Sequence, residues 1–290
     1  MSLPPITIIG TGGLGTALAH ALSEAGIPIK SVFNRSGEVA EDLAGELSIP
    51  VFGSFPTDSE MLGKLVFITV SDRAIDEIAR RLAELDRDFS DRIFVHCSGN
   101  ESDALLESLK NKNASVASFH PLQTFSSGAR PVDFQDIYFS VQGDEEAYER
   151  LEEVAGKLGA HAIQISAGQK SRLHAAAVFA SNYLATLLET ATEIAASEEL
   201  TREEAGKMLL PLIKTTLHNA ESASFGDALT GPIKRGDLQT VKKHLELLKG
   251  DRNFLDMYCS LGRQALQIAE RNGSIEETTA EKMRTILNGD

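Results

Sequence analysis

Residues 6–15 read Ile6-Thr-Ile-Ile-Gly10-Thr-Gly12-Gly-Leu-Gly15, an apolar run that leads into the pattern Gly-x-Gly-x-x-Gly. An amphipathic segment follows directly, so this stretch predicts a strand that turns sharply into a helix. In such a unit Gly10 forms the tight turn, Gly12 lets the backbone approach a pyrophosphate, and Gly15 lets the helix pack against the strand. Free N–H groups at the helix start favour phosphate oxygens. We expect a dinucleotide to contact Gly10, Thr11, Gly12, Gly13, Leu14 and Gly15.

The rest of the first half alternates short apolar runs with amphipathic helical segments. Consecutive Val, Ile and Phe residues are typical of strands in a sheet that is covered on both faces. The predicted strands are 6–10, 30–34, 51–53, 65–70, 92–97, 115–119, 137–141 and 162–165. The predicted helices are 13–25, 38–47, 75–85, 102–110 and 145–158. This alternation predicts an α/β fold with a doubly wound, mainly parallel sheet, a Rossmann domain over residues 1–166.

Strand signals stop near residue 166, and residues 167–290 are predicted to form an all-helical domain. Its first segment, 169–197, is predicted to be one helix of about eight turns. An apolar stripe at helical spacing runs along it, made of Leu173, Ala177, Ala180, Leu184, Leu187, Ala191 and Ile194. Further helices are predicted at 202–220, 238–249, 253–272 and 275–287. The long apolar helix favours a homodimer through this domain, and a helix buried in its own core is the alternative.

The end of the second predicted strand distinguishes NADP from NAD. It reads Val32-Phe33-Asn34-Arg35-Ser36, without a carboxylate where NAD-binding domains hold the ribose 2′-hydroxyl. A guanidinium between two small polar side chains suits a 2′-phosphate, through charge-assisted hydrogen bonds. The sequence therefore predicts NADP, contacted by Asn34, Arg35 and Ser36. In the alternative, Arg35 is a solvated residue in a turn.

Two later predicted strands end in small or polar residues, at 70–72 and 97–100. Ligands bind outside the carboxyl ends of the strands in open α/β sheets. We therefore expect Val70, Ser71, Ser98 and Gly99 to line the ribose and the nicotinamide. Ser71 equally suits the cap of the helix that follows, and the two roles are compatible.

Composition limits the classes of partner. A formal net charge of −14 argues against nucleic acid, because binding a phosphate backbone requires a concentrated basic face. No apolar run approaches the ~20 residues of a membrane span, and the N-terminus does not resemble a signal peptide. Cys97 and Cys259 are far apart and lack metal-ligand spacing. We expect reduced thiols, no metal, and a cytoplasmic protein that acts on a small molecule.

Longer motifs support a resemblance that covers nearly the whole chain. They are Gly10–Gly15, Asn34–Ser36, Cys97–Gly99, Ser118-Phe-His-Pro-Leu-Gln-Thr-Phe125 and Leu229-Thr-Gly-Pro-Ile-Lys-Arg-Gly-Asp237. The chain resembles a family of uncharacterised NADP-dependent oxidoreductases that have a Rossmann domain and a distinctive helical C-terminal domain. That family is related to pyrroline-5-carboxylate reductase, the β-hydroxyacid dehydrogenases, prephenate dehydrogenase and the deazaflavin-dependent NADP reductases. The resemblance implies a fold and a cofactor, and it does not supply a substrate.

One departure from these relatives affects the chemistry. β-Hydroxyacid dehydrogenases carry Lys-x-x-x-Asn on the first helix after the Rossmann domain, with the lysine as general acid or base. Here Asn182 lies on the corresponding helix, and Val178 stands where that lysine would fall. His174 and Lys170 lie one and two turns earlier on roughly the same face. The lysine mechanism therefore does not transfer to this sequence.

Candidate catalytic residues come from the need to move a proton during hydride transfer. His120 ends the sixth predicted strand, His174 lies near the start of the long helix, and Asn182 follows on that helix. Histidine titrates near neutral pH, and an asparagine can orient a substrate. For each, a structural or surface role is the alternative. The other histidines are expected to be structural: His20, His96, His161, His218 and His244.

These observations predict an NADP(H)-dependent oxidoreductase that transfers a hydride to or from a small carbonyl, imine or hydroxy-acid metabolite. Its substrate is expected in a cleft between the two domains. Two alternatives stay open: a protein that binds NADP without turnover, as a sensor or scaffold, and a deazaflavin-dependent NADP reductase.

Overall fold

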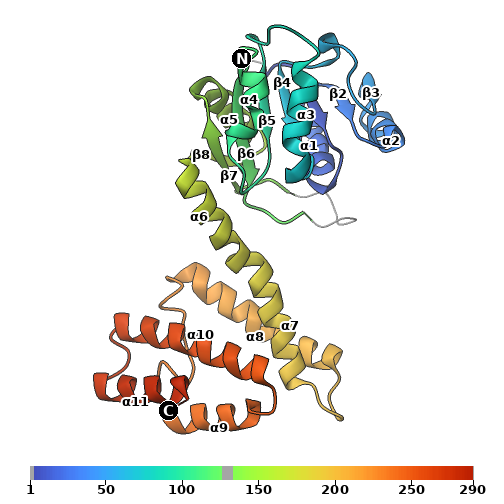
Figure 1. Ribbon diagram of the computed structural model, residues 1–290. Helices are drawn as coiled ribbons and strands as arrows, with labels where there is room; N and C mark the ends of the chain where they lie inside the picture. Colours follow the sequence, from blue (N-terminus) through green and yellow to red (C-terminus); the bar gives the residue numbers. More distant parts are fainter. Residues whose placement is uncertain (1–2, 126–132, 290) are drawn as a thin grey trace. The chain divides into compact units, whose positions relative to one another are not determined.

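The computed structural model describes residues 3–125 and 133–289 (Figure 1). By its internal contacts the chain divides into two compact units, Met1–Tyr183 and Leu184–Asp290. The change from strands to helices comes earlier, between the last strand, which ends at Gln164, and a helix that begins at Ala167.

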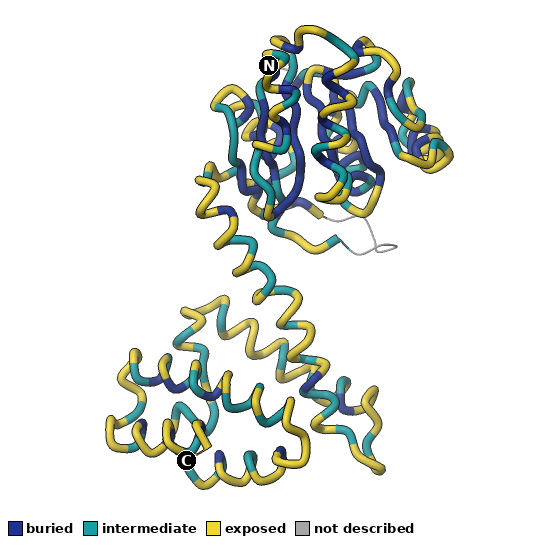
Figure 2. Tube along the Cα trace, viewed as in Figure 1, coloured by how far each residue is buried: buried dark blue, intermediate teal, exposed yellow. Residues whose placement is uncertain are grey.

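The first unit is built on an 8-stranded sheet in the order β3-β2-β1-β4-β5-β6-β7-β8. Neighbouring strands are parallel except for β6 and β7, which are antiparallel. Its central strands β1, β4 and β5 form the most buried part of this unit, whereas the edge strands β3 and β8 are partly exposed (Figure 2). Their bounds are β1 Ile6–Ile9, β2 Ile29–Phe33, β3 Val51–Gly53, β4 Leu65–Ile68, β5 Ile93–His96, β6 Ser115–Pro121, β7 Tyr138–Gly143 and β8 His161–Gln164. The predicted doubly wound, mainly parallel fold is confirmed.

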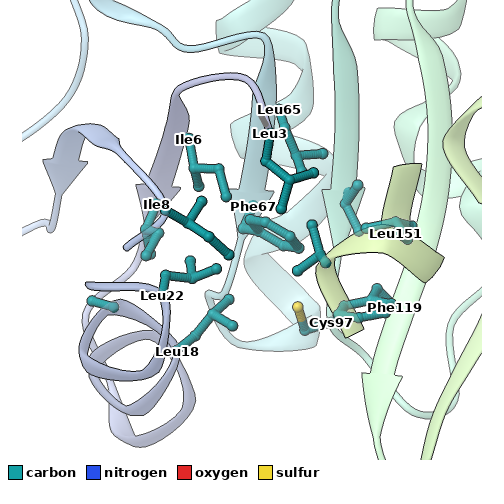
Figure 3. Packing of buried hydrophobic residues seen from close by; sticks show 14 of the residues in the cluster. Leu3, Ile6, Ile8, Leu18, Leu22, Leu65, Phe67, Cys97, Phe119 and Leu151 are labelled. Carbon is teal, nitrogen blue, oxygen red and sulfur yellow. The ribbon is translucent and has the colours of Figure 1, made fainter. Parts of the chain in front are cut away.

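Helices cover both faces of the sheet, and alternate side chains of each strand point to opposite faces. Leu65 and Phe67 of β4 join the core formed with α1, α2 and α5, whereas Val66 and Ile68 join the core formed with α3 and α4. Figure 3 shows the first of these cores, with Phe67 at its centre. The bounds are α1 Gly13–Glu24, α2 Gly37–Leu47, η1 Ser59–Met61, α3 Asp72–Ala83, η2 Asp103–Leu106, α4 Glu107–Lys110 and α5 Glu145–Lys157. The strands are apolar at consecutive positions because helices cover both faces of the sheet.

The chain order of the strands reverses between β1 and β4. From β1 the chain builds outward through β2 and β3, and it then returns to add β4 on the other side of β1. Connections that diverge in this way leave a crevice at the carboxyl ends of the two strands, which is where open α/β sheets bind ligands. Residues 10–12 and 69–71 lie at this point of the sheet.

Two helical segments differ from the sequence prediction. Residues 102–110 were expected to form one helix, but they form a 3-10 turn, Asp103–Leu106, followed by the short α4. The expected single helix over 169–197 consists of α6 Ala167–Val178, a π-helical turn Phe179–Tyr183, and α7 Leu184–Ala195. The extra residue per turn of a π-helix rotates the side chains after it, so the apolar stripe does not keep one face.

The second unit is helical, as predicted, with α7 followed by α8 Arg202–Ser222, α9 Leu238–Leu248, α10 Arg252–Arg271 and α11 Glu277–Asn288. Its buried cluster is small and joins α9, α10 and α11 through Val241, Leu266, Ala280, Met283 and Leu287. In contrast, α8 leaves Met208 69% exposed and Leu212 63% exposed. None of the helices among the described residues is long and apolar enough to cross a membrane.

Candidate active site

The three glycines of the first loop have different surroundings. Gly10 has a φ of +104°, a conformation that side-chain-bearing residues rarely adopt, so it forms the tight turn after β1. A Cβ on Gly15 would collide with the carbonyl oxygen of Gly10, so its absence lets α1 pack against the end of β1. A Cβ on Gly12 would meet nothing within 4 Å. The backbone is therefore tightly packed at Gly10 and Gly15, whereas at Gly12 it faces unoccupied space.

Asn34 connects this loop to the end of β2. Its Nδ2 donates to Thr11 Oγ1 at 2.5 Å, and its Oδ1 accepts from the Ser36 backbone N–H at 3.1 Å. On the other side of the loop, Thr69 Oγ1 donates to the Gly10 carbonyl at 2.5 Å. The ends of β1, β2 and β4 are thus held together by short polar contacts.

These strand ends surround a cavity of about 590 Å³. Seven of the predicted cofactor residues line it: Gly10, Thr11, Gly12, Asn34, Arg35, Val70 and Ser71. The other predicted contacts, namely Gly13, Leu14, Gly15, Ser36, Ser98 and Gly99, are outside its wall. Ser71 precedes α3 without a side-chain capping bond, so its hydroxyl is not used as a helix cap.

Two arginines and an aromatic ring line the cavity beyond β2. Arg35 is exposed, and the Arg81 guanidinium lies 3.9 Å from the centre of the Phe55 ring. Glu77 is the carboxylate in the same wall. The sequence identifies Arg35 by its place directly after the second strand. It does not identify Arg81, because only the fold brings this residue of α3 into the same cavity wall as Arg35.

The histidines predicted to be catalytic lie together. The ring centroids of His120 and His174 are 6.0 Å apart, with an interplanar angle of 70°. A Cβ added to Gly99 would lie 2.5 Å from His174 Nδ1 and 2.7 Å from His120 Nε2. Both nitrogens therefore converge over Gly99, and a side chain at that position would displace one or both rings. Among the described residues His174 Nδ1 is buried without a hydrogen-bond partner.

His120 has a defined neutral tautomer. Its Nδ1 lies 3.1 Å from the Cys97 carbonyl oxygen. Because a carbonyl oxygen only accepts, Nδ1 carries the hydrogen, and Nε2 presents a lone pair toward Gly99 when the ring is neutral. Burial lowers the pKa of His120 below its usual value, and the nearby charge of Lys170 lowers it further.

Lys170 is a component that the sequence reasoning left out of the site. It is 2% exposed, and its Nζ donates to the Ser98 carbonyl at 2.7 Å and to Ser118 Oγ at 2.9 Å. Burial lowers the pKa of Lys170 to about 8. The sequence placed Lys170 on the same helix face as His174, but it did not show that this face covers the ends of β5 and β6.

Cys97 and His96, which flank this region, are structural. The Cys97 side chain points into the core beside Phe119, and burial raises the pKa of its thiol to about 12 (Figure 3). His96 donates from Nε2 to the Ser102 carbonyl and accepts from the Ser98 N–H at Nδ1. Burial lowers the pKa of His96 to about 4, so this ring stays neutral.

The remaining candidates are placed differently from the histidine pair. Asn182 lies two turns beyond His174, in the π-helical turn, and is exposed. The Ser98 hydroxyl accepts backbone N–H groups of Asn100 and Glu101, so it stabilises the turn after β5. Across residues 3–125 and 133–289, no group of three or more His, Cys, Asp or Glu side chains is arranged to hold a metal ion.

Comparison with known families agrees with this arrangement. Residues 5–100 match the family described as "NADP oxidoreductase coenzyme F420-dependent", and residues 137–265 match the "Domain of unknown function (DUF2520)". The first of these two matches contains the glycine loop and the cavity, whereas Lys170 and His174 lie within the second.

Solved structures with a similar fold match most of the chain. A "putative NADP oxidoreductase" from Bacteroides fragilis is 29% identical, with a TM-score of 0.72, and the match covers 91% of this chain and 98% of that one. A Thermotoga maritima protein is 26% identical, with a TM-score of 0.71 over 92% and 99% of the two chains. The pyrroline-5-carboxylate reductase of Streptococcus pyogenes, 16% identical with a TM-score of 0.63 over 98% and 99%, shares the fold. Among curated proteins, none matches the sequence.

Proposed function

We propose that this protein is an NADP(H)-dependent oxidoreductase that transfers a hydride to or from a small carbonyl, imine or hydroxy-acid compound. The observation that carries the proposal is the cavity at the reversal of strand order, which is lined by the open Gly12 backbone and by Arg35. The match to an NADP oxidoreductase domain supports the same class of reaction.

The preference for NADP over NAD rests on the charges beyond β2. Arg35 and Arg81 bring two guanidinium groups to the cavity wall, and neither makes an ion pair among the described residues. Both are available for a 2′-phosphate. We expect Arg35→Ala to weaken NADPH binding by about 10- to 100-fold and NADH binding little, because one charge-assisted contact contributes roughly 1.5–3 kcal/mol. Arg80→Ala is the matched control, since Arg80 pairs with Asp76 away from the cavity.

The proton of the reaction is assigned to His120. Its Nε2 faces the space over Gly99. In the oxidative direction neutral Nε2 accepts the proton of a substrate hydroxyl, and in the reductive direction the imidazolium returns that proton to the substrate oxygen or nitrogen. His174 Nδ1 faces the same point and supplies a second polar contact to that oxygen or nitrogen. Asn182 remains a proposed substrate-orienting residue.

Turnover tests the proposal. NADPH absorbance is followed with panels of imines, keto acids and aldehydes, and NADP reduction with hydroxy acids. Saturable turnover that His120→Gln lowers by about 10²- to 10⁴-fold, with NADPH affinity unchanged, supports it. His161→Gln on β8 is the control, because that side chain is exposed. NADPH binding without turnover favours a sensor or scaffold, and turnover only with coenzyme F420 favours a deazaflavin-dependent reductase.

A homodimer and a cytoplasmic location belong to the same proposal. The apolar side chains that α8 leaves exposed, Met208 and Leu212 among them, support association through the second unit. Cys97 and Cys259 are free thiols, which is typical of a reducing compartment where NADPH is also available.

A further inference from the structure

Lys170 occupies a position that does not favour a charged side chain. It is 2% exposed and lies in the first turn of α6, where the helix dipole is positive. No carboxylate lies within ion-pair distance of it in the described part of the chain. Its Nζ has two acceptors, the Ser98 carbonyl and Ser118 Oγ, for three N–H groups. An uncompensated buried ammonium costs free energy, so this residue is not explained by stability.

The helix start holds Lys170 in place. Ser166 accepts the Gln169 backbone N–H, and the Gln169 side chain accepts the Ser166 N–H, which forms a capping box. The Lys170 backbone then donates to the Ser166 carbonyl. The backbone of Lys170 is therefore held in a capped first turn, and its ammonium is held by the bonds to Ser98 and Ser118.

The same short segment after β5 accepts hydrogen bonds from both Lys170 and His120. Lys170 Nζ binds the Ser98 carbonyl, and His120 Nδ1 binds the adjacent Cys97 carbonyl. Ser118, the second acceptor of Lys170, lies two residues before His120 on β6, so both side chains lie on the same side of that strand. The ammonium and the imidazole are thus fixed relative to each other through three elements, β5, β6 and α6.

The groups around His120 shift its pKa in opposite directions. From α6, the charge of Lys170 and that of a protonated His174 both disfavour the imidazolium. From α3, Asp72 favours it, and so does the bond to the Cys97 carbonyl. The Cys97 thiol and the His96 ring on β5 are uncharged near neutral pH. Lys170 is therefore the permanent cation that faces His120 between pH 5 and 7.

We propose that Lys170 is a positioning residue whose buried charge adds to the effect of burial in keeping His120 neutral, with its Nε2 lone pair free toward Gly99. Lys170 acts on the reaction through His120 and through the Ser98 carbonyl, without contact with the substrate. This inference rests on the proposed function for its role in catalysis, but the effect on His120 exists without any nucleotide.

Histidine NMR titration tests it directly. Protein labelled with ¹⁵N and ¹³C in histidine is titrated from pH 4.5 to 8 as wild type, Lys170→Gln and Lys170→Arg. The His120 signal is assigned by its loss in His120→Gln. Glutamine keeps a donor for Ser98 or Ser118 and removes the charge, so we expect the pKa of His120 to rise by roughly one unit. Arginine keeps the charge, and the pKa of His120 should stay close to that of the wild type.

Two further variants keep the result interpretable. Ser118→Ala removes one acceptor and no charge, and it should leave the titration of His120 unchanged. If Lys170→Gln does not fold, Lys170→Met provides the uncharged side chain instead. A His120 pKa that is the same in wild type and in the uncharged variant overturns the proposal. Failure of the proposed function would show separately, as absent NADPH binding or turnover in the wild type.

Once a substrate is found, the pH profile gives a second readout. If neutral His120 accepts the proton, activity falls as pH decreases through its pKa. Lys170→Gln should then move this acid limb to higher pH and lower kcat at pH 6 by several-fold more than at pH 8. A uniform loss of kcat at every pH contradicts the role proposed for the charge.

Discussion

Gly12 and Gly15 are the same residue type, but their surroundings differ. The first faces open space at the cavity, and the second lies against the Gly10 carbonyl. Sequence spacing alone assigned these two roles, because the geometry of a strand–turn–helix unit fixes which glycine faces the ligand. An alanine substitution at each of the two positions therefore separates the ligand-binding role of Gly12 from the packing role of Gly15.

Alanine at each position should affect a different property. Gly15→Ala places a methyl group against backbone and should lower the free energy of unfolding by about 1–3 kcal/mol. Gly12→Ala should change stability by less than about 1 kcal/mol, while it weakens NADPH binding by about tenfold or more. Urea unfolding and nucleotide titration measure the two effects. Equal effects of both variants on unfolding would contradict the assignment.

Lys170 should make stability depend on pH in the alkaline range. Its pKa is about 8 in the fold, below the 10.5 of a free lysine, so the unfolded chain binds more protons between these values. The free energy of unfolding of the wild type should therefore rise with pH through this window, on the order of 2 kcal/mol. Below pH 8 the cost of burying the charged ammonium is present in full. Urea unfolding of wild type and Lys170→Met at pH 7 and 9.5 measures it, with Lys207→Met as an exposed control. Parallel pH dependence in wild type and Lys170→Met would refute the burial cost.

The catalytic candidates show where sequence reasoning ended. His120 was predicted from its place at a strand end, and His174 from its place near a helix start. Their convergence over Gly99, and the contact of Lys170 with Ser98, depend on how α6 packs against β5 and β6. No spacing within one segment contains that information, because the contacting residues are separated by dozens of positions in the chain.

At the scale of elements, the strands were predictable and the helical details less so. Every predicted strand is present, since runs such as Leu65–Ile68 are apolar on both faces. The π-helical turn Phe179–Tyr183 was missed, because an apolar 3.6-residue period continues through it. The 3-10 turn Asp103–Leu106 was missed as well, because short helices of both types have similar sequences.

The position of a strand in the sheet should determine how much its phenylalanine stabilises the fold. Phe67 on central β4 is 0% exposed, whereas Phe52 on the edge strand β3 is 42% exposed. We expect Phe67→Ala to lower the free energy of unfolding by about 3–5 kcal/mol, and Phe52→Ala by less than about 1 kcal/mol. Urea unfolding followed by circular dichroism compares them. Similar costs would contradict the difference in burial between the two rings.

At the scale of the whole molecule, the proposed homodimer is the prediction that the sequence supports least directly. Buried hydrophobic residues are plentiful around the sheet and few in the second unit (Figure 2). Within α8, Met208 and Leu212 lie one turn apart and are mostly exposed. Covering such side chains with a second copy of the chain removes apolar surface from water, which favours association.

Light scattering after gel filtration tests the dimer. Wild type should have twice the mass of the 31.3 kDa chain, and Met208→Asp with Leu212→Asp should shift the protein toward the single-chain mass. Arg252→Asp on α10 is a control for added negative charge, since its side chain is solvent-exposed. A wild type that elutes at the single-chain mass over all concentrations contradicts the proposal.

The central claim, that this fold binds NADP at the ends of β1, β2 and β4, is tested most directly by calorimetric titration of the wild-type protein with NADPH and with NADH. We predict micromolar binding of NADPH and binding of NADH that is at least about tenfold weaker, because only the former presents a 2′-phosphate to Arg35. Equal or tighter binding of NADH would contradict the assigned specificity. Binding of neither nucleotide would contradict the proposed function itself.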